Sequence, residues 1–262
     1  MGTSSDVPAL RRGLAVLQLL AGRAGPISAS TIARELGLPR STTYHLLGEL
    51  ESARFVTRLP SERRYGLGIA AFELGSAYLR HDPLERLAGP LLRELVEQVG
   101  HNAHLGVLHG NELLYLIKER PIRPETLITG VGVRLPAHLT ACGRAILAYL
   151  PAAQIRALFP SASSFVRRTE RGPNSLASLR TVLAAERHRG WASEDGHITP
   201  GFASVAYPVF DHNQRPIAAI SVTFRHHCEA TPCQADWTPL ADRLRTAADS
   251  LTQRIGGRAG QR

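Results

Sequence analysis

The strongest constraint on the fold is a pair of short helical segments separated by a glycine turn, close to the start of the 262-residue chain. Ser28 is a favourable N-cap for a helix from Ala29 to Leu36, and Gly37 stands where a helix ends in the left-handed conformation. A further helix is expected from about Arg40 to Ala53, and apolar spacing predicts another from Ala9 to Ala21. Two short helices joined by such a turn form a helix-turn-helix pattern.

Two short runs of β-forming residues follow this pattern. Phe55–Arg58 and Arg64–Leu67 flank a polar turn, which predicts a hairpin. A hairpin directly after a helix-turn-helix is a wing, so residues 1–68 are expected to form a winged helix-turn-helix, with the helix pair at about 28–53 and the wing at 55–67. Such small units also serve as protein-interaction modules. The combination of capped helix, glycine turn, polar basic helix face and arginine-tipped hairpin favours nucleic-acid binding.

Charge supports this interpretation. The chain has a formal net charge of +9, and Lys118 is the one lysine among its 31 basic residues. Residues 1–68 hold nine arginines against five acidic side chains, a net charge of +4, and a basic small unit favours a polyanionic partner. The expected partner is a double-stranded DNA operator. The side chains expected to contact it are Ser28, Thr31, Arg40, Ser41, Thr42, Tyr44, His45, Arg58, Arg63 and Arg64.

The rest of the chain mixes helices with antiparallel strands. We expect a linker helix at 69–83, an α+β domain at 84–255 and a frayed tail at 256–262. Within the α+β domain the patterns predict helices at Leu84–Val99, Ala141–Leu150, Ser175–Arg189 and Ala235–Ile255, hairpins at 103–117 and 203–224, and a further strand at Leu127–Val133.

Several stretches resemble one family in the same order along the chain. Residues 37–50 (GLPRSTTYHLLGEL) resemble the recognition helix of IclR-type transcriptional regulators, and residues 64–68 (RYGLG) resemble the end of their wing. Further matches lie at 104–108, 134–145, 194–196 and 218–222. The resemblance implies an N-terminal winged helix-turn-helix, a linker helix and a C-terminal GAF-like effector-binding domain, in dimers that often pair into tetramers. Two residues depart from it: His45 stands where Arg is common, and Ser204 where several members have Cys.

A small-molecule site is expected in the C-terminal domain. Ser204 and Ser221 can direct hydroxyls from neighbouring strands into one cavity. The helix that begins near Ala141 and Cys142 offers backbone N–H groups to an anion, with Arg144 as a further donor. The resemblance implies effector contacts at Ala141, Cys142, Glu194, Ser204 and Ser221. A convergence of donors suits a carboxylate, so the expected effector is a small organic acid.

Catalysis and metal binding are not expected. The sequence holds no Gly-x-Ser-x-Gly elbow, phosphate-binding loop, dinucleotide fingerprint or zincin motif, so no catalytic residue, cofactor or metal site is predicted. His226, His227, Cys228 and Cys233 could supply zinc ligands, but adjacent histidines point to opposite faces of a strand. An enzyme or metabolite-binding protein with the winged helix as an interaction module is the alternative.

Composition also bears on location and assembly. The sequence has no run of about 18 apolar residues, no signal-peptide pattern at its start and an odd number of cysteines, three, so we expect a cytoplasmic protein without a membrane partner. Taken together, the sequence predicts a sequence-specific DNA-binding transcriptional regulator. It is expected to be a homodimer or homotetramer on a palindromic operator, with repression favoured and with operator affinity modulated by the effector.

Overall fold

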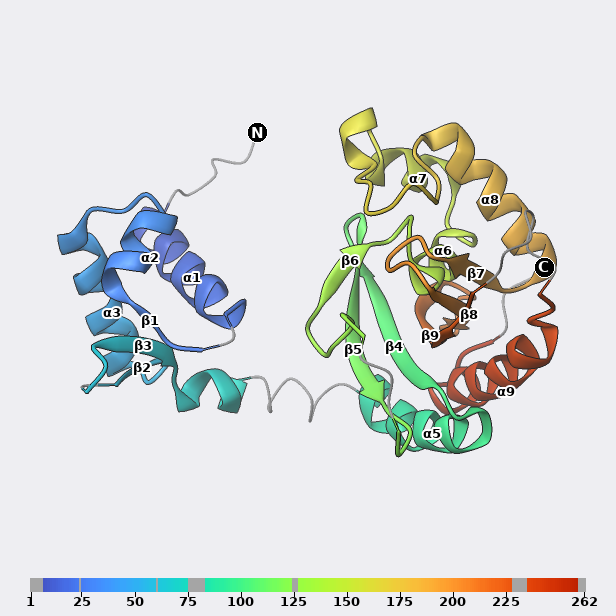
Figure 1. Ribbon diagram of the computed structural model, residues 1–262, viewed down its shortest axis with the longest axis horizontal. Coiled ribbons are helices and arrows are strands. Elements are labelled where there is room, and N and C mark those ends of the chain that lie inside the picture. Colours follow the sequence, from blue (N-terminus) through green and yellow to red (C-terminus); the bar gives the residue numbers. More distant parts are fainter. Residues whose placement is uncertain are drawn as a thin grey trace. The chain divides into compact units, whose positions relative to one another are not determined.

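A computed structural model describes residues 7–23, 25–59, 61–74, 83–123, 127–227 and 235–258. The chain divides into two compact units, Met1–His81 and Asp82–Arg262, each with its own core (Figure 1). The expected α+β class, with a helix-turn-helix unit followed by a domain of mixed helices and strands, is confirmed.

The first unit contains three helices and a small sheet. Helices α1 (Pro8–Ala21), α2 (Ala29–Glu35) and α3 (Arg40–Ser52) precede the hairpin of β2 (Val56–Leu59) and β3 (Arg64–Leu67). A two-residue strand, β1 (Ile27–Ser28), adds to β3, so the sheet order is β1-β3-β2. The core joins all of these elements and includes Val16, Ile32, Leu47, Val56 and Tyr65.

Local chemistry explains where these helices begin and end. The Ser28 hydroxyl accepts a hydrogen bond from the Thr31 backbone N–H (3.2 Å), which caps α2. Gly37 has a φ of +61°, a conformation that costs glycine little, and it turns the chain toward α3. Thr43 is fully buried in α3 and donates to the Pro39 carbonyl (3.1 Å). After the wing, residues 69–74 are helical, as the expected linker helix requires, and its continuation to 82 lies outside the described residues.

The second unit is built on a six-stranded antiparallel sheet in the order β6-β5-β4-β9-β8-β7. Its strands are β4 (Asn102–His109), β5 (Glu112–Glu119), β6 (Arg134–Pro136), β7 (Ala192–Asp195), β8 (Phe202–Phe210) and β9 (Pro216–Arg225). Its helices are α5 (Pro83–Val99), α6 (Ala141–Leu147), α7 (Ala152–Leu158), α8 (Leu176–Arg189) and α9 (Thr238–Arg254), with a 3₁₀ turn at Ala162–Ser164.

The helices cover the two faces of this sheet (Figure 1). Apolar side chains of α5 and α9 pack on one face, against residues such as Leu105, Val205 and Val222. Helix α6 packs on the other face, where Cys142 and Ile146 meet Ala206 and Ala219. Successive side chains alternate between the faces of a strand, so the residues between the α5–α9 core positions face α6.

Some elements differ from those expected. The predicted strand at Leu127–Val133 is wrong: the described part of this segment is a loop with a turn at Gly132 (φ +81°), and the strand is β6, which follows it. Helix α7 and strand β7 were not expected, and α6 ends three residues early. Residues 256–258 are not frayed, because Gly257 donates to the Thr252 carbonyl (2.7 Å) and Arg258 donates to the Asp211 carbonyl (3.1 Å).

Candidate nucleic-acid interface and small-molecule cavity

The helix-turn-helix and the wing share a groove on the surface of the first unit. The groove has about 900 Å³ of space open to solvent and is lined by Ser28, Ala29, Ser30, Arg40, Tyr44, Arg58, Arg63 and Tyr65. Five of the ten expected DNA contacts therefore border one concave surface. The other five, Thr31, Ser41, Thr42, His45 and Arg64, belong to the same elements but do not line it.

Helix α3 presents a polar face to solvent at its first turns. Arg40, Ser41, Tyr44 and His45 are exposed, and Thr42 is half-buried. Tyr44 is 57% exposed, which leaves its ring available to a partner. The opposite face holds Thr43 and Leu47 in the core, so the helix cannot turn its polar face inward without losing that packing.

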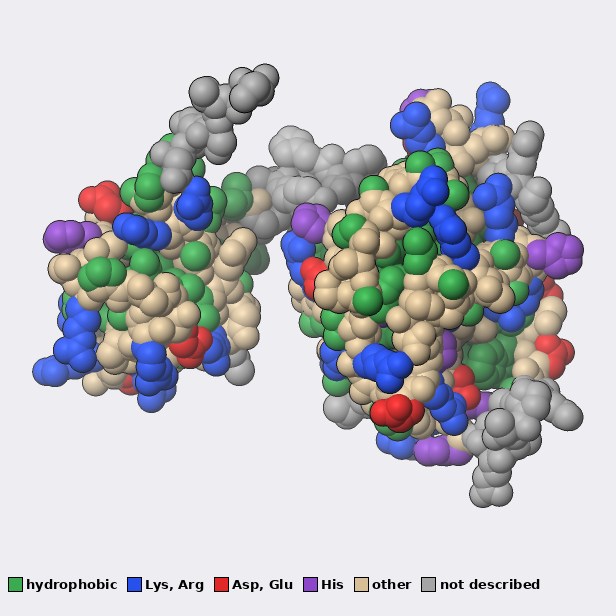
Figure 2. All heavy atoms as spheres, turned by 90° about the horizontal axis from the view of Figure 1, so that it is seen from above, with side chains coloured by type: hydrophobic (Ala, Val, Ile, Leu, Met, Phe, Trp, Pro, Cys, Tyr) green, Lys and Arg blue, Asp and Glu red, His purple; other side chains and the backbone are tan. Residues whose placement is uncertain are grey.

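The wing places two of its three arginine side chains, Arg58 and Arg63, in the lining of the groove. Arg58, Arg63 and Arg64 are all exposed, and the basic side chains of this unit project into solvent at its surface (Figure 2). Arg64 lies 3.7 Å from the Glu62 carboxylate, an exposed pair that is worth little in water. Guanidinium groups held this way can contact the phosphates of a duplex.

Ser28 and Thr31 already have local hydrogen-bond partners. The Ser28 hydroxyl caps α2 and lies 2.8 Å from the Ser30 hydroxyl and 3.0 Å from that of Thr31. Both residues are half-buried. Their main structural role is therefore to hold the start of α2 beside the groove.

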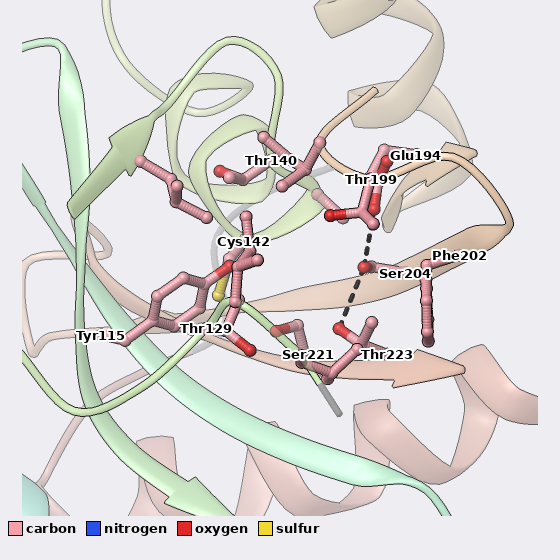
Figure 3. Close-up of a pocket in the computed structure, with 15 residues that line it drawn as sticks. Tyr115, Thr129, Thr140, Cys142, Glu194, Thr199, Phe202, Ser204, Ser221 and Thr223 are labelled. Carbon is pink, nitrogen blue, oxygen red and sulfur yellow. Dashed lines mark hydrogen bonds between the residues drawn. The ribbon is translucent and has the colours of Figure 1, made fainter. Parts of the chain in front are cut away.

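A cavity lies between the sheet of the second unit and the start of α6 (Figure 3). The space between its walls is about 410 Å³ when the open solvent at its mouth is included. The wall combines apolar side chains with hydroxyls and one carboxyl group. Its residues are Tyr115, Leu127, Ile128, Thr129, Leu135, Thr140, Ala141, Cys142, Glu194, Ile198, Thr199, Phe202, Ser204, Ser221 and Thr223.

All five expected effector contacts line this cavity. Ala141 and Cys142 come from α6, Glu194 from β7, Ser204 from β8 and Ser221 from β9. The strand register brings the last three together. Ser204 pairs directly with Glu194, and Ser221 pairs with Ala206, two residues along the strand from Ser204. Residues from four separate segments therefore meet at one place.

Glu194 is the one ionisable carboxyl group among the described residues of this wall. Its Oε1 accepts from the Ser204 hydroxyl (2.8 Å) and its Oε2 accepts from the His197 backbone N–H (2.9 Å). Burial raises the pKa of the Glu194 carboxyl to about 7, against the smaller opposing effect of these two hydrogen bonds. The side chain therefore exchanges its proton near neutral pH, and it does not act as a fixed negative charge in the cavity.

The Cys142 thiol is unreactive at neutral pH. It is 1% exposed and donates to the Ala219 carbonyl at 3.2 Å. Burial raises the pKa of this thiol to about 12, so the reactive thiolate is not populated at neutral pH. Cys142 shapes the cavity wall as a small apolar side chain.

The prediction that Arg144 is a donor in the cavity is wrong. Arg144 lies in α6, its side chain is fully buried, and it does not line the cavity. The Nε donates to both oxygens of Glu186 (3.0 and 3.2 Å), Nη1 donates to the His138 and Leu139 carbonyls, and Nη2 donates to the Ser193 carbonyl. These acceptors take up the N–H groups of the guanidinium. The Arg144 side chain therefore joins α6 to α8 and β7, and it is not a donor for a ligand.

Two models of protein families match the chain. The model of the bacterial transcriptional regulator IclR C-terminal domain matches residues 76–253, and that of the IclR helix-turn-helix domain matches residues 9–60. The chain belongs to the IclR family. It is a DNA-binding transcriptional regulator with an effector-binding C-terminal domain.

Named relatives within the IclR family cover most of the chain. The glycerol operon regulatory protein of Streptomyces griseus is 32% identical over 255 residues, 96% of this chain and 97% of that protein. The transcriptional repressor IclR of Escherichia coli is 29% identical over 224 residues, 84% of this chain and 81% of its own. An IclR homologue from Microbacterium hydrocarbonoxydans, solved with 4-hydroxybenzoate, shares the fold with a TM-score of 0.82 at 24% identity, covering 95% of this chain and 99% of that one.

Several residues that line the cavity of this IclR-family chain were not predicted from the sequence. Thr223 lies two residues beyond Ser221 on one strand, so the alternation of a strand could have placed it on the same face. Tyr115 could have been found in the same way, from the hairpin of β4 and β5. Thr129 comes from the loop mistaken for a strand, and no local signal marks it.

The histidines near the end of β9 have other surroundings. The His226 ring lies 5.2 Å from the Trp237 ring, edge to face, and His227 borders an open hollow beside Gly201. Cys228 and Cys233 lie outside the described residues. Within the described part of the chain no three metal-ligating side chains converge, and no helix there has the length and apolar character of a membrane span.

Proposed function

We propose that this regulator binds its operator through the groove of the first unit and its effector in the cavity of the second. The observation that carries the second assignment is the convergence of Ala141, Cys142, Glu194, Ser204 and Ser221 on one cavity. The first is supported by the exposed arginines and Tyr44 around the groove. The proposed DNA contacts are the ten residues named above, from the N-cap of α2, from α2 and α3 and from the wing, on a palindromic operator.

The proposed effector is a small organic acid. Apolar side chains such as Leu135, Ile198 and Phe202 suit a hydrocarbon body, and the hydroxyls of Ser221 and Thr129 can donate to a carboxylate. Within the described wall no Lys or Arg faces the ligand. A protonated Glu194 adds a further donor, so the acid is expected to bind together with a proton on that residue.

The short helix α6 has a smaller part in this proposal than its sequence suggests. It has seven residues, and the Thr140 hydroxyl already accepts from the Gly143 N–H (3.0 Å). Ala141 and Cys142 are therefore proposed as wall residues in contact with the effector, and the hydroxyls and Glu194 carry the recognition.

We further infer that the protein acts as a homodimer or a dimer of dimers in the cytoplasm, where its operator lies. Exposed apolar side chains on α1 and on helical residues 69–74 support self-association: Leu10, Leu14, Ile69, Phe72 and Leu74 are each more than half exposed. An effector changes operator affinity only if it binds two arrangements of the assembly unequally. Repression is the proposed sign, since the Escherichia coli relative is a repressor.

Regulation without catalysis is part of the same proposal. The buried Cys142 thiol, with its raised pKa, is a poor nucleophile at neutral pH. The named relatives are likewise transcriptional regulators.

The test uses an operator selected from a random pool of duplexes with the full-length protein. Fluorescence anisotropy then measures operator affinity with and without each member of a panel of organic acids, and calorimetry measures acid binding directly. The double variant Ser204→Ala, Ser221→Ala should keep operator affinity and lose the acid response. An acid that binds the wild type and the double variant equally well overturns the cavity assignment.

A further inference from the structure

Tyr115 lines the effector cavity, and its hydroxyl is open to that space. The residue is 5% exposed, and its ring packs in one cluster with Cys142 and Ala219. Among the described residues the Tyr115 hydroxyl has no hydrogen-bond partner, yet it is not one of the side-chain polar atoms there that are sealed from solvent without a partner. Its oxygen therefore faces the open space of the cavity.

The strand register gives this ring room to extend across the sheet. Tyr115 on β5 stands directly opposite Gly106 on β4, and Gly106 stands opposite Ala219 on β9. Opposite residues of an antiparallel pair point to the same face, and neither of these two neighbours has a side chain beyond Cβ. The ring can therefore lie over β4 and reach toward Cys142, as Figure 3 shows.

Both the backbone and the ring of Tyr115 are held in place without a ligand. Its N–H donates to the Val133 carbonyl (3.1 Å), and its carbonyl accepts from the Gly132 N–H (2.9 Å). The ring centroid lies 5.1 Å from that of His104. Burial raises the pKa of the Tyr115 phenol well above its ordinary value of 10, so the group keeps its proton at neutral pH. The cavity therefore contains a positioned O–H donor at this point.

Four other hydroxyls of the wall already have partners within the protein. Ser204 donates to Glu194 (2.8 Å), and because its one proton is used there, Thr223 donates to Ser204 (3.0 Å). Thr140 donates to a backbone carbonyl (3.3 Å), and Thr129 lies 2.9 Å from a ring nitrogen of a buried histidine. Since no Lys or Arg lies in the described wall, a carboxylate there depends on O–H donors that are not yet used. A phenol is more acidic than an aliphatic hydroxyl and is the stronger donor.

We propose that Tyr115 is a specificity-determining contact of the effector, and that its phenol O–H donates to the carboxylate of the acid. This inference rests on the proposed function, because it assigns a further donor to the same organic acid in the same cavity. A hydrogen bond to a charged acceptor is stronger than one to a neutral acceptor. Tyr115 therefore favours a carboxylate over the uncharged amide of the same acid.

The first arm of the test needs no ligand. Thermal unfolding is measured for the full-length wild type, Tyr115→Phe and the control Tyr207→Phe, which removes the hydroxyl of a tyrosine that packs against the core on the other face of the sheet. Tyr115→Phe keeps the ring and loses no hydrogen bond within the protein, so its melting temperature should stay within about 2 °C of the wild type. A larger fall would mean that the hydroxyl is bonded inside the protein, and the Tyr115 contact would be rejected.

The second arm measures dissociation constants by calorimetry for three acids and their primary amides. The pairs are propionate and propionamide, hexanoate and hexanamide, and benzoate and benzamide. For an acid that binds the wild type, Tyr115→Phe should weaken binding by about tenfold or more, and should weaken any binding of the matched amide by less. Tyr207→Phe should bind each compound as the wild type does.

The outcomes separate this inference from the proposed function. An acid that binds the wild type and Tyr115→Phe equally, but not the Ser204→Ala, Ser221→Ala variant, keeps the proposed cavity and overturns the Tyr115 contact. An acid weakened by Tyr115→Phe and not by that double variant keeps Tyr115 and overturns the assignment of the two serines. Equal weakening of acid and amide overturns the selection of charge. If none of the three acids binds the wild type, the organic-acid effector fails, and the Tyr115 contact that depends on it fails as well.

Discussion

The groove of the first unit and the cavity of the second differ in how their residues come together. Groove residues lie between positions 28 and 65, in one helix pair and one hairpin. Cavity residues span positions 115 to 223 and meet through sheet register and a loop. The groove includes four long, exposed side chains (Arg40, Tyr44, Arg58 and Arg63), whereas most residues of the cavity wall are buried. A site built from neighbouring elements can be inferred from local patterns, whereas a site built by register needs the whole fold.

Two arginines, one in each unit, show the same contrast between an exposed and a buried side chain. Arg40 is exposed at the start of α3, and Arg144 is fully buried at the centre of α6. Sequence alone treats both as donors for an anionic partner. The structure assigns Arg144 to the interior, so the functions of the two residues are separable by experiment.

The largest expected effect is on folding. Arg144→Ala leaves the Glu186 carboxylate buried without its partner, and breaking a buried pair in this way costs about 3–5 kcal/mol. We expect the free energy of unfolding of the second unit to fall by this amount in chemical denaturation. Operator affinity, measured at a temperature where the variant is folded, should change little.

A double variant controls for the charge itself. Arg144→Met with Glu186→Leu removes both charges and should recover much of the lost stability, because the remaining cost of an unpaired buried charge disappears. If Arg144→Ala were as stable as the wild type but lost its response to acids, Arg144 would be a ligand donor after all and the contrast with Arg40 would fail.

The sequence predicted the first unit more fully than the second. Capping by Ser28, the turn at Gly37 and the wing follow from short-range rules, and each is present in the structure. The β1 strand was missed because two residues carry no periodicity. In the second unit the hairpins were predicted, but the segment at 127–133 has strand-like composition and forms a loop, since the edge position beside β5 is taken by β6.

The candidate sites follow the same division. The polar face of α3 could be predicted from its spacing alone. Ser204 and Ser221 were placed in one cavity from the hairpin, but the pairing of Ser204 with Glu194 depends on β7, which the sequence did not reveal. The burial of Arg144 depends on α8 and on the 138–139 turn, and no local pattern specifies that packing.

The next largest effect should be on DNA binding. Arg40→Ala is expected to weaken operator binding by about 1–3 kcal/mol if the guanidinium contacts a guanine edge, and to relax specificity at one position. The free energy of unfolding should stay within about 0.5 kcal/mol of the wild type, since the side chain is exposed. Anisotropy titrations on the selected operator and on its single-base variants measure both changes.

Arg34→Ala is the matched control, because Arg34 is exposed in the same unit but does not line the groove. It should leave specificity unchanged. If operator binding is unaffected by Arg40→Ala combined with Thr42→Ala, α3 is not the helix that recognises the bases.

A smaller effect concerns the pH dependence of stability. The Glu194 pKa is raised from 4.5 to about 7 on folding, so the folded state holds this proton more tightly than the unfolded state. Its contribution to stability is complete below about pH 4.5 and is lost as the pH rises toward 7, on the order of 1 kcal/mol per pH unit. Glu194→Gln, which keeps an acceptor for Ser204, should show a flatter dependence between pH 5 and 7.

Asp195→Asn is the matched control at the next position, where the carboxylate is paired with Arg171 at the surface of the second unit. It should keep the steeper slope of the wild type. Parallel stability curves for Glu194→Gln and the wild type would show that Glu194 is ionised throughout this range, and the cavity would then carry a fixed negative charge.

The smallest expected effect is at the wing, and it tests whether the groove is uniform in function. Arg63 lies at the tip of the hairpin, so its guanidinium is expected to contact phosphate and not a base edge. Arg63→Ala should reduce the slope of log affinity against log salt by about 0.9, and weaken binding to operator and to unrelated DNA alike by a few-fold. Arg245→Ala, an exposed change on α9, should leave the slope intact. A changed base preference with an unchanged slope would make the wing a base-reading element, and recognition would then extend across the whole groove.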